Sequence, residues 1–264
     1  MDDVQLTRYS RHILLPEVGI EGQTRIRGAH VLVVGVGGLG APVSIYLASA
    51  GIGAMTLCDG DRVDLTNLQR QIIFRSGDVG RLKVEAATDA IAALNPEVPV
   101  TGIAERISAA RLDRLVADAD IVVDCSDNFP TRHAINRACV EHHRPLVSGA
   151  GVRFDGQVSV FDLRQSASPC YGCLFPEDAE IEETRCAVMG VFAPVVGMIG
   201  TVQAAEVLKL AAGIGESLSG RLLLLDVLAM EWRTVHLRKD PGCRVCGTSA
   251  SPPGSIERLA GSSC

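Results

Sequence analysis

Short apolar runs alternate with longer segments of helical periodicity along the first 150 residues. The apolar runs predict buried strands at residues 30–34, 54–59, 99–104, 121–124 and 145–148. The segments between them predict helices at residues 41–50, 83–94, 112–117 and 131–143, and a short polar helix is predicted at residues 6–19. Strands that alternate with helices pair in parallel through βαβ units. The expected fold class is therefore α/β, with a doubly wound, Rossmann-like sheet.

The pattern changes beyond Gly149, where the sequence is typical of β-hairpins. Residues 156–163 and 221–237 predict antiparallel strands that extend the same sheet into a mixed one. No long linker rich in Pro, Gly or Ser divides residues 1–248, so these residues are expected to form one domain. Residues 249–264 have the composition of a flexible tail.

Residues 186–205 contain no Asp, Glu, Lys or Arg and are long enough to cross a membrane. Pro194 and three glycines interrupt this segment, however, and it continues into the amphipathic stretch AAEVLKLAAG, which ends at a glycine. These features favour a buried helix in a soluble core. No membrane association is expected.

The amino-acid composition predicts a soluble globular protein, since 47% of residues are hydrophobic and 21% are charged. The 25 basic and 31 acidic residues give a net charge of −6, so no basic surface for nucleic acid is expected. The N-terminal sequence MDDVQLTRYSRH is polar and lacks the apolar region of a secretion signal. A cytoplasmic location follows as an expectation.

The sequence GVGGLG at residues 35–40 lies between the first predicted strand and the following helix. Glycines in this position allow a tight turn and a close approach to phosphate at the start of the helix. Asp59 ends the second strand, where a carboxylate can accept hydrogen bonds from ribose hydroxyls. The pattern predicts a bound nucleotide, and taken alone it is most typical of NAD-dependent dehydrogenases.

Polar residues near two strand ends change that picture. Asn67, Arg70 and Lys83 follow the acidic end of the second strand, and Asp127 with Asn128 follows the strand at residues 121–124. Cations and an amide suit a triphosphate, and a carboxylate at a strand end can hold Mg²⁺. The pattern therefore favours ATP with Mg²⁺ over NAD.

Four of the nine cysteines form two CxxC pairs, Cys170 with Cys173 and Cys243 with Cys246. Each pair lies in a turn flanked by Pro or Gly and can span two corners of a zinc tetrahedron. Two disulfides are the alternative, which a chain without a secretion signal disfavours. We expect a closed structural zinc site with four cysteine ligands, which leaves no open coordination position for catalysis.

Cys186 lies apart from these pairs, between an acidic stretch with Arg185 and the apolar segment. A neighbouring positive charge favours the thiolate form of a cysteine. Cys186 is therefore a candidate nucleophile.

Six segments occur in a fixed order along with the two CxxC pairs. They are RYSRHILLPEVGIEGQ, VLVVGVGGLG, DGDRVDLTNLQRQ, VGRLKVEAA, DCSDN and PLVSGA. In this combination the chain resembles the bacterial E1-like adenylyltransferases of the MoeB, ThiF and HesA group, over roughly residues 5–247.

The resemblance implies an enzyme that binds MgATP and transfers AMP to the C-terminal glycine of a small ubiquitin-like sulfur carrier protein. A separate sulfur donor would then convert the acyl-adenylate into a thiocarboxylate. The implied nucleotide-binding residues are Gly38, Asp59, Thr66, Asn67, Leu68, Gln69, Arg70, Lys83, Asp127 and Asn128. The implied catalytic residues are Arg11, Arg70, Lys83, Asp127 and Cys186.

Three of these residues have specific implied roles. Asp127 would help to place Mg²⁺, and Cys186 would stand where related enzymes have a cysteine that can bond to the activated glycine. Arg11 would reach the ATP of a neighbouring subunit, which implies a homodimer.

Two other functions are weighed against this one. The first is an NAD-dependent oxidoreductase, supported by GVGGLG and Asp59 alone. The second is a nucleotide-binding partner protein without chemistry, which the combination of Arg70, Lys83 and Asp127 disfavours. The sequence leaves open whether the pathway leads to molybdopterin, thiamin, cysteine or a secondary metabolite.

Overall fold

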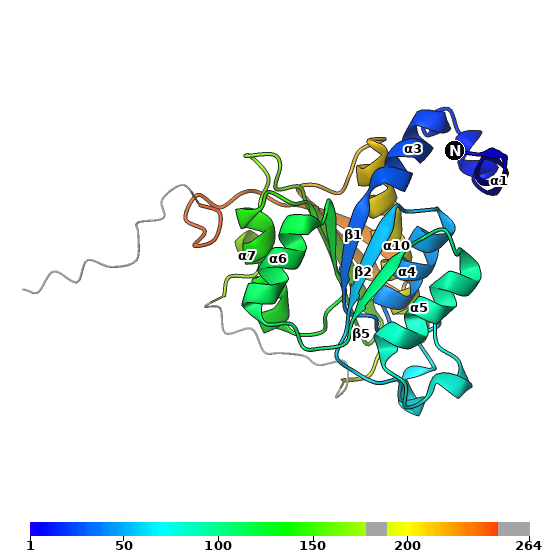
Figure 1. Cartoon of the computed structure of the whole chain (residues 1–264). Coiled ribbons are helices and arrows are strands. Elements are labelled where there is room, and N and C mark those ends of the chain that lie inside the picture. Colours follow the sequence, from blue (N-terminus) through cyan, green and yellow to red (C-terminus); the bar gives the residue numbers. More distant parts are fainter. Residues whose placement is uncertain (178–188, 248–264) are drawn as a thin grey trace, which may run out of the picture.

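A computed structural model describes residues 1–177 and 189–247 of the chain. The chain is organised around one eight-stranded sheet with the strand order β3-β2-β1-β4-β5-β6-β7-β8 (Figure 1). The sheet is mixed and helices cover both of its faces, so the predicted α/β fold class is confirmed. The tail expected at residues 249–264 lies outside the described residues.

The first five strands are parallel. They are β1 (His30–Val34), β2 (Ala54–Cys58), β3 (Val100–Ile103), β4 (Ile121–Asp124) and β5 (Leu146–Val152). The helices between them are α4 (Gly40–Ser49), α5 (Lys83–Leu94), α6 (Ala109–Asp118) and α7 (Phe129–Glu141). Because β1 pairs with β2 on one side and β4 on the other, the strand order reverses at β1. In open α/β sheets, ligands bind at such a reversal, outside the carboxyl ends of the strands.

The last three strands are antiparallel, as predicted. They are β6 (Asp155–Phe161), β7 (Arg221–Asp226) and β8 (Glu231–His236). β5 continues four residues beyond its predicted end because Gly149, Ala150, Gly151 and Val152 pair with β6 across a tight turn. The late hairpins therefore extend the parallel sheet directly.

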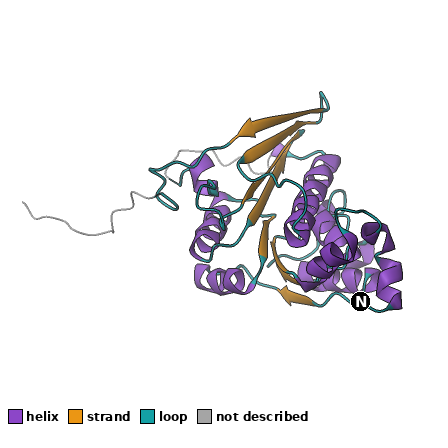
Figure 2. Cartoon of the chain, turned by 90° about the horizontal axis from the view of Figure 1, so that it is seen from above, coloured by secondary structure: helices purple, strands orange, loops and turns teal. Residues whose placement is uncertain are grey.

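Helices cover the sheet in two layers (Figure 2). One face packs against α4, α5 and α10 (Ala193–Ala212) and contains the larger apolar cluster. The other face packs against α6 and α7 and contains the second cluster. Strand side chains point alternately to the two faces, so the buried strands are apolar at nearly every position.

Among the described residues, α10 is long and apolar enough to cross a membrane, and half of its apolar stretch is buried. It packs against α3 (Gly19–Gly28), α4 and β5. A Cβ at Gly200 would lie 2.5 Å from the Leu39 carbonyl oxygen, so glycine is needed for this close approach. α10 is thus a helix of the protein core, as the sequence predicted.

The N-terminal region differs from the sequence prediction. Instead of one helix over residues 6–19, there are two short helices, α1 (Asp3–Arg8) and α2 (Ser10–Ile13), followed by α3. Long-range hydrogen bonds hold α3 in place, since Gln23 Nε2 donates to the Ala50 carbonyl at 2.8 Å and Arg25 Nε donates to the Ala212 carbonyl at 2.6 Å. Such contacts with distant segments leave no periodic signal in the local sequence.

Candidate functional site

A pocket of about 840 Å³ lies at the carboxyl ends of the parallel strands. Loops after β1, β2 and β4 line its inner half, and residues of β5 to β8 line its outer half. The predicted nucleotide residues that line it are Gly38, Asp59, Asn67, Arg70, Lys83, Asp127 and Asn128. Residues from four separate parts of the sequence thus meet in one cavity.

The glycine turn after β1 and the carboxylate of Asp59 are joined by a hydrogen bond. The Val36 N–H donates to Asp59 Oδ2 at 2.8 Å, and the Asp61 N–H donates to Asp59 Oδ1 at 2.9 Å. Gly35 begins the turn with φ +93°, and a Cβ there would lie 2.6 Å from the Cys125 carbonyl oxygen. The turn can therefore form only with glycine at this position.

Lys83 brings a buried positive charge to the same corner of the pocket. Its ammonium lies 3.0 Å from Asp61 Oδ2 and 3.9 Å from Asp59 Oδ2, and its side chain is only 8% exposed. Burial raises the pKa of Asp59, and the Lys83 charge acts against that shift. A cation and a carboxylate are thus fixed side by side where a nucleotide would meet the glycine turn.

The short helix η1 (Leu65–Asn67) positions Arg70. Asp64 caps this helix and accepts hydrogen bonds from the Thr66 hydroxyl and N–H, which lower the pKa of the Asp64 carboxyl. The Thr66 carbonyl in turn accepts a hydrogen bond from Arg70 Nη1 at 3.1 Å. Thr66, Leu68 and Gln69 do not line the pocket. Thr66 thus supports Arg70 through its backbone.

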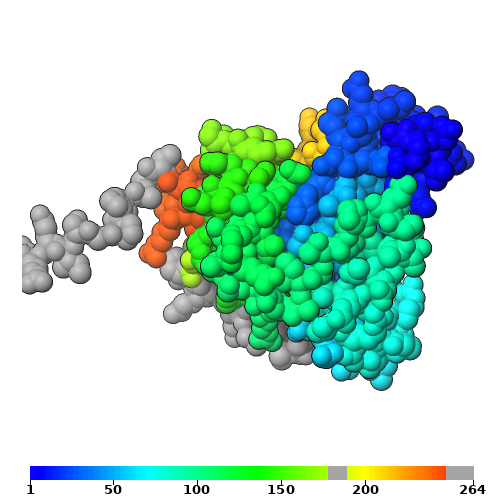
Figure 3. Space-filling model, in the orientation of Figure 1, coloured from blue at the N-terminus to red at the C-terminus, as the bar shows by residue number. Residues whose placement is uncertain are grey.

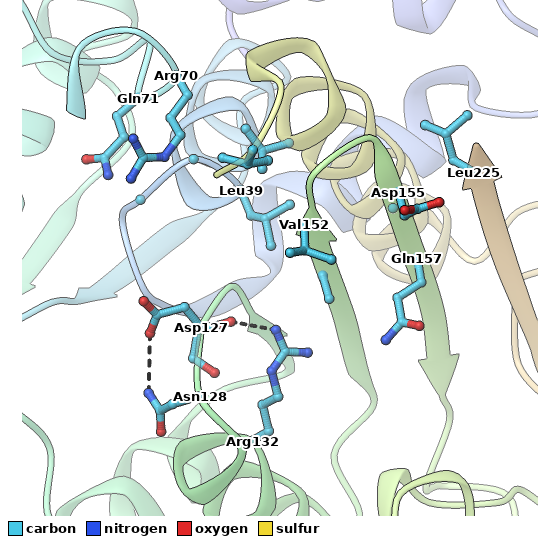
Figure 4. A pocket seen from close by; sticks show the side chains of 18 of the residues that line it. Leu39, Arg70, Gln71, Asp127, Asn128, Arg132, Val152, Asp155, Gln157 and Leu225 are labelled. Carbon is cyan, nitrogen blue, oxygen red and sulfur yellow. Dashed lines mark hydrogen bonds between the residues drawn. The ribbon is translucent and has the colours of Figure 1, made fainter. Parts of the chain in front are cut away.

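The loop after β4 supplies Asp127 and Asn128. Asn128 is the N-cap of α7, because its Oδ1 accepts the Thr131 N–H at 2.9 Å. Its Nδ2 lies 3.4 Å from Asp127 Oδ1, so the cap also holds the neighbouring carboxylate. Figure 4 shows both side chains across the cavity from Arg70. An exposed carboxylate at this strand end has the chemistry to hold Mg²⁺.

The pocket also contains residues that the sequence analysis missed. Arg132 lines the pocket although it is only 8% exposed, and Gln71 lines it beside Gly37. Arg132 falls in a predicted helix without any motif of its own, and only the arrangement of α7 against β4 turns it inward. The polar sequence NLQRQ contains Gln71 and was its only signal.

Two predicted catalytic residues are not in this cavity. Arg11 lies on α2, is exposed and does not line the pocket. Cys186 lies outside the described residues.

The four paired cysteines meet in one cluster, with all four sulfur atoms within 4.8 Å of one another. The Cys170–Cys173, Cys170–Cys243 and Cys173–Cys246 sulfur separations are 4.0, 3.7 and 3.4 Å. A tetrahedral zinc ion with bonds of about 2.3 Å places its sulfur ligands about 3.8 Å apart. None of these four is disulfide-bonded, so the disulfide alternative is not favoured.

The surroundings of this cluster also fit a metal with thiolate ligands. Asn136 Nδ2 donates to Cys170 Sγ, and the Asp240 N–H donates to Cys173 Sγ, each at 3.5 Å. Donors of this kind orient and stabilise thiolates around a zinc ion. The four cysteines fit a closed structural zinc site.

The fold and the pocket together are typical of a nucleotide-binding α/β protein with a four-cysteine cluster. Comparison with known proteins identifies the family within this class. The sequence matches the model of the ThiF family over residues 9–245. The chain belongs to the ThiF family. This confirms the resemblance to E1-like adenylyltransferases that the motifs indicated.

Individual relatives are similar over nearly the whole chain. The sulfur carrier protein ThiS adenylyltransferase of Escherichia coli is 43% identical, over 96% of this chain and 100% of that protein. The molybdopterin-synthase adenylyltransferase of the same organism is 42% identical, over 94% of this chain and 98% of that protein. A crystal structure of E. coli MccB with ATP has a TM-score of 0.80 at 28% identity, over 91% of this chain and 73% of that chain.

Proposed function

We propose that this protein uses MgATP to adenylate the C-terminal glycine of a small ubiquitin-like sulfur carrier protein, which activates the carrier for thiocarboxylate formation. The observation that carries the proposal is one pocket that unites the glycine turn, Asp59, Arg70, Lys83 and Asp127. Membership of the ThiF family and the similarity to two adenylyltransferases support the same reaction.

In this proposal the inner half of the pocket takes ATP. Gly38 lies against the phosphates, Asp59 accepts hydrogen bonds from the ribose, and Arg70 and Lys83 bind the triphosphate. Asp127 is the residue that would hold Mg²⁺, whose charge, when bound, would stabilise the leaving pyrophosphate. Asn67 and Asn128 add amide groups to the same wall.

The outer half of the pocket, lined by β5 to β8, takes the extended C-terminus of the carrier. A carboxylate oxygen of the terminal glycine forms a bond to the α-phosphorus. The bond from that phosphorus to the oxygen bridging to the β-phosphate breaks, and its electron pair leaves with pyrophosphate. Both reacting groups are anionic, so the cations of the inner half lower the repulsion between them.

The two alternative functions are not favoured. An NAD-dependent oxidoreductase would share the glycine turn and Asp59, but the diphosphate of NAD has less negative charge to match Arg70 and Lys83 than a triphosphate has. A nucleotide-binding partner protein without chemistry would need Arg70, Lys83 and Asp127 only to hold the nucleotide. The adenylyltransferase relatives disfavour both readings.

ATP–pyrophosphate exchange tests the proposal directly. Exchange measured with a panel of recombinant ubiquitin-like sulfur carriers should require Mg²⁺ and a carrier that ends in an exposed glycine. The carrier that supports exchange would also identify the pathway. Absence of exchange with every carrier, together with tight binding of NAD, would overturn the proposal in favour of the oxidoreductase.

We also propose a homodimer in which Arg11 reaches the partner's nucleotide. Tyr9, just before α2, packs against Gly51 and accepts a hydrogen bond from Asn95 Nδ2 at 3.0 Å. Both contacts lie just before a strand, at the amino edge of the parallel sheet, whereas the pocket is at the carboxyl edge. In Figure 3 the N-terminal segment (dark blue) lies at the upper right and the segment that contains η1 (cyan) lies at the lower right. This separation supports a role for Arg11 at the site of another chain rather than at the site of its own chain.

Cys186 and the sulfur donor belong to the step after adenylation. The adenylate is reactive enough for a persulfide on a separate donor protein to attack it directly, so we propose that AMP transfer does not need Cys186. The thiol would act only in sulfur transfer. A cytoplasmic location is part of the same proposal, because the reaction uses ATP and thiols in reduced form.

A further inference from the structure

Arg132 is a buried cation that the nucleotide contacts proposed above do not use. It lies in the first turn of α7, is 8% exposed and lines the pocket. In the view of Figure 4 its guanidinium extends into the cavity between Asp127 and Gln157. A cation in this position, away from bulk water, interacts strongly with any anion that enters.

The guanidinium is fixed by neighbours that leave its charge in place. Nη2 donates to the Ser126 carbonyl at 2.6 Å, and the Tyr171 hydroxyl lies beside the group. The buried Asp124 is nearby, but its oxygens accept hydrogen bonds from the Ser126 N–H, the Ser126 hydroxyl and the Ser148 hydroxyl. Burial lowers the pKa of Arg132 and the Asp124 charge raises it, with a net upward shift. Arg132 thus stays cationic.

Arg132 has N–H donors with which it can bind a ligand. A guanidinium has five N–H donors in a planar fork. Within residues 1–177 and 189–247, its partners are the Ser126 carbonyl and the Tyr171 hydroxyl. The remaining donors suit a carboxylate, which a guanidinium binds through two parallel hydrogen bonds.

The position of Arg132 indicates which anion it meets. Arg70 and Lys83 lie in the inner half of the pocket, by the glycine turn, where the triphosphate is proposed. Arg132 lies at the boundary with the outer half, opposite Gln157 of β6. A carrier C-terminus that enters over β6 reaches Arg132 where its carboxylate must approach the α-phosphate.

We infer that Arg132 binds the terminal carboxylate of the carrier and holds it ready to attack ATP. The inference rests on the proposed function. It makes Arg132 a determinant of specificity for a free C-terminal carboxylate, distinct from the cations that bind the triphosphate.

The test compares two forms of the carrier that supports exchange, one with a free C-terminal carboxylate and one with a C-terminal amide. Their dissociation constants are measured in the presence of α,β-methylene-ATP, which prevents the reaction. The wild-type protein should prefer the carboxylate by roughly 10- to 100-fold, the effect of a charge-assisted hydrogen-bonded pair. Arg132→Gln should reduce this preference to below about threefold and leave the affinity for α,β-methylene-ATP within about threefold.

Arg137→Gln is the matched control, because Arg137 lies on the same helix, is exposed and pairs with Glu177 outside the pocket. It should keep the wild-type preference. An undiminished preference for the carboxylate in Arg132→Gln would overturn the inference and leave Arg132 a structural residue. Loss of nucleotide affinity with the preference intact would also overturn it.

Two further outcomes remain decisive. If Arg132→Gln does not fold, Arg132→Lys keeps the charge but loses the planar fork, and its preference should fall at least about threefold. Full preference in Arg132→Lys would contradict the inference. A wild-type protein that binds both carrier forms equally would also overturn the inference, whereas failure of every carrier to support ATP–pyrophosphate exchange would overturn the proposed function on which it rests.

Discussion

At the scale of single residues, three of the cations that line the pocket are each held by a different neighbour. Arg70 is bonded to the Thr66 carbonyl, Lys83 to the Asp61 carboxylate and Arg132 to the Ser126 carbonyl. Two of the three anchors are backbone carbonyls, which orient a cation without neutralising it. Arg70 and Arg132 can therefore offer their charge to an incoming triphosphate and carboxylate, whereas the charge of Lys83 is partly offset by Asp61.

The first prediction concerns Arg70. Arg70→Ala should lower the rate of ATP–pyrophosphate exchange by about 10²-fold or more, the typical effect of removing one donor that stabilises charge in a transition state. Exchange at saturating carrier and ATP is the measurement. Arg111→Ala is the control, since Arg111 lies on α6 in a surface ion pair with Glu105. A rate near that of the wild type in Arg70→Ala would remove Arg70 from the mechanism.

Asp59 and Lys83 give the site a dependence on pH. Burial raises the pKa of Asp59 above its ordinary value of 3.8, and Lys83 opposes the shift. The folded protein therefore holds this proton more tightly than the unfolded chain does. As pH rises from 3.8 through the raised pKa, ionisation of Asp59 lowers the stability of the fold. The same ionisation creates the acceptor that a ribose needs.

The second prediction follows from that coupling. Lys83→Met removes the charge that opposes the shift, so the pKa of Asp59 should rise further. The acid limb of adenosine binding, measured by titration calorimetry from about pH 4 to pH 8, should move to higher pH. Adenosine has no phosphates, so direct contact of Lys83 with phosphate does not enter. Asp59→Asn should bind adenosine weakly and show no acid limb, and a limb that persists in this variant would mean that Asp59 does not bind the ribose. An unmoved limb in Lys83→Met would contradict the coupling between Lys83 and Asp59.

At the scale of elements, the short helix α8 (Tyr171–Leu174) links the four-cysteine cluster to the pocket. Cys170 and Cys173 belong to the cluster, whereas Tyr171 between them lines the pocket. Asn136 of α7 joins the two, because its Nδ2 donates to Cys170 Sγ and its Oδ1 accepts the Tyr171 N–H at 2.9 Å. A metal ion held by the cluster would therefore fasten the segment that contains Cys243 and Cys246 to a wall of the pocket.

The third prediction is one tightly held zinc ion per chain, bound by Cys170, Cys173, Cys243 and Cys246. Cys243→Ala should release the metal and lower the melting temperature, since three thiolates no longer close the site. Elemental analysis and thermal unfolding of protein purified under reducing conditions provide the two readouts. Cys139→Ala, which removes a buried cysteine outside the cluster, should keep the zinc. Metal-free wild-type protein prepared without chelator would contradict the prediction.

Strands and helices with strong local patterns could be predicted from the sequence. β1 and β4 are short apolar runs that are buried at most positions. The predicted bounds of β1, residues 30–34, are those of the observed strand. α3 could not be predicted in this way, because its buried residues include Gln23 and Gly22 and its support comes from residues 27 to 187 positions away. Local periodicity contains no information about such partners.

The site divides in the same manner. Gly38, Asp59 and Lys83 lie in motifs whose chemistry can be recognised in the sequence, and all three line the pocket. Arg132 lines the pocket because α7 packs against β4, and Tyr171 lines it because the cysteine cluster holds α8 there. Neither contact could be predicted from the local sequence. Motifs locate the parts of the site that follow directly after strands, whereas tertiary packing decides which other side chains face the cavity.

At the scale of the whole molecule, one chain does not bring all of the implied catalytic residues together. Arg11 lies at the amino edge of the sheet and the pocket lies at the carboxyl edge. Leu14, Leu15 and Ile20 follow Arg11 and are 69%, 49% and 59% exposed. Exposed apolar side chains in a group favour burial against another subunit. Both features fit the proposed dimer with shared sites.

The last prediction tests that sharing by mixing two inactive variants. In a heterodimer of Arg11→Ala and Lys83→Ala chains, one site lacks both residues and the other contains both, because each site combines Lys83 of one chain with Arg11 of the other. Equimolar chains that reassort at random form heterodimers in half of all dimers, so exchange should recover to about a quarter of the wild-type rate. The measurement is carrier-dependent exchange after denaturation and refolding together, with each variant refolded alone as the control. Recovery no greater than that of the separate variants would mean that Arg11 does not act on the partner's nucleotide, whatever the oligomeric state.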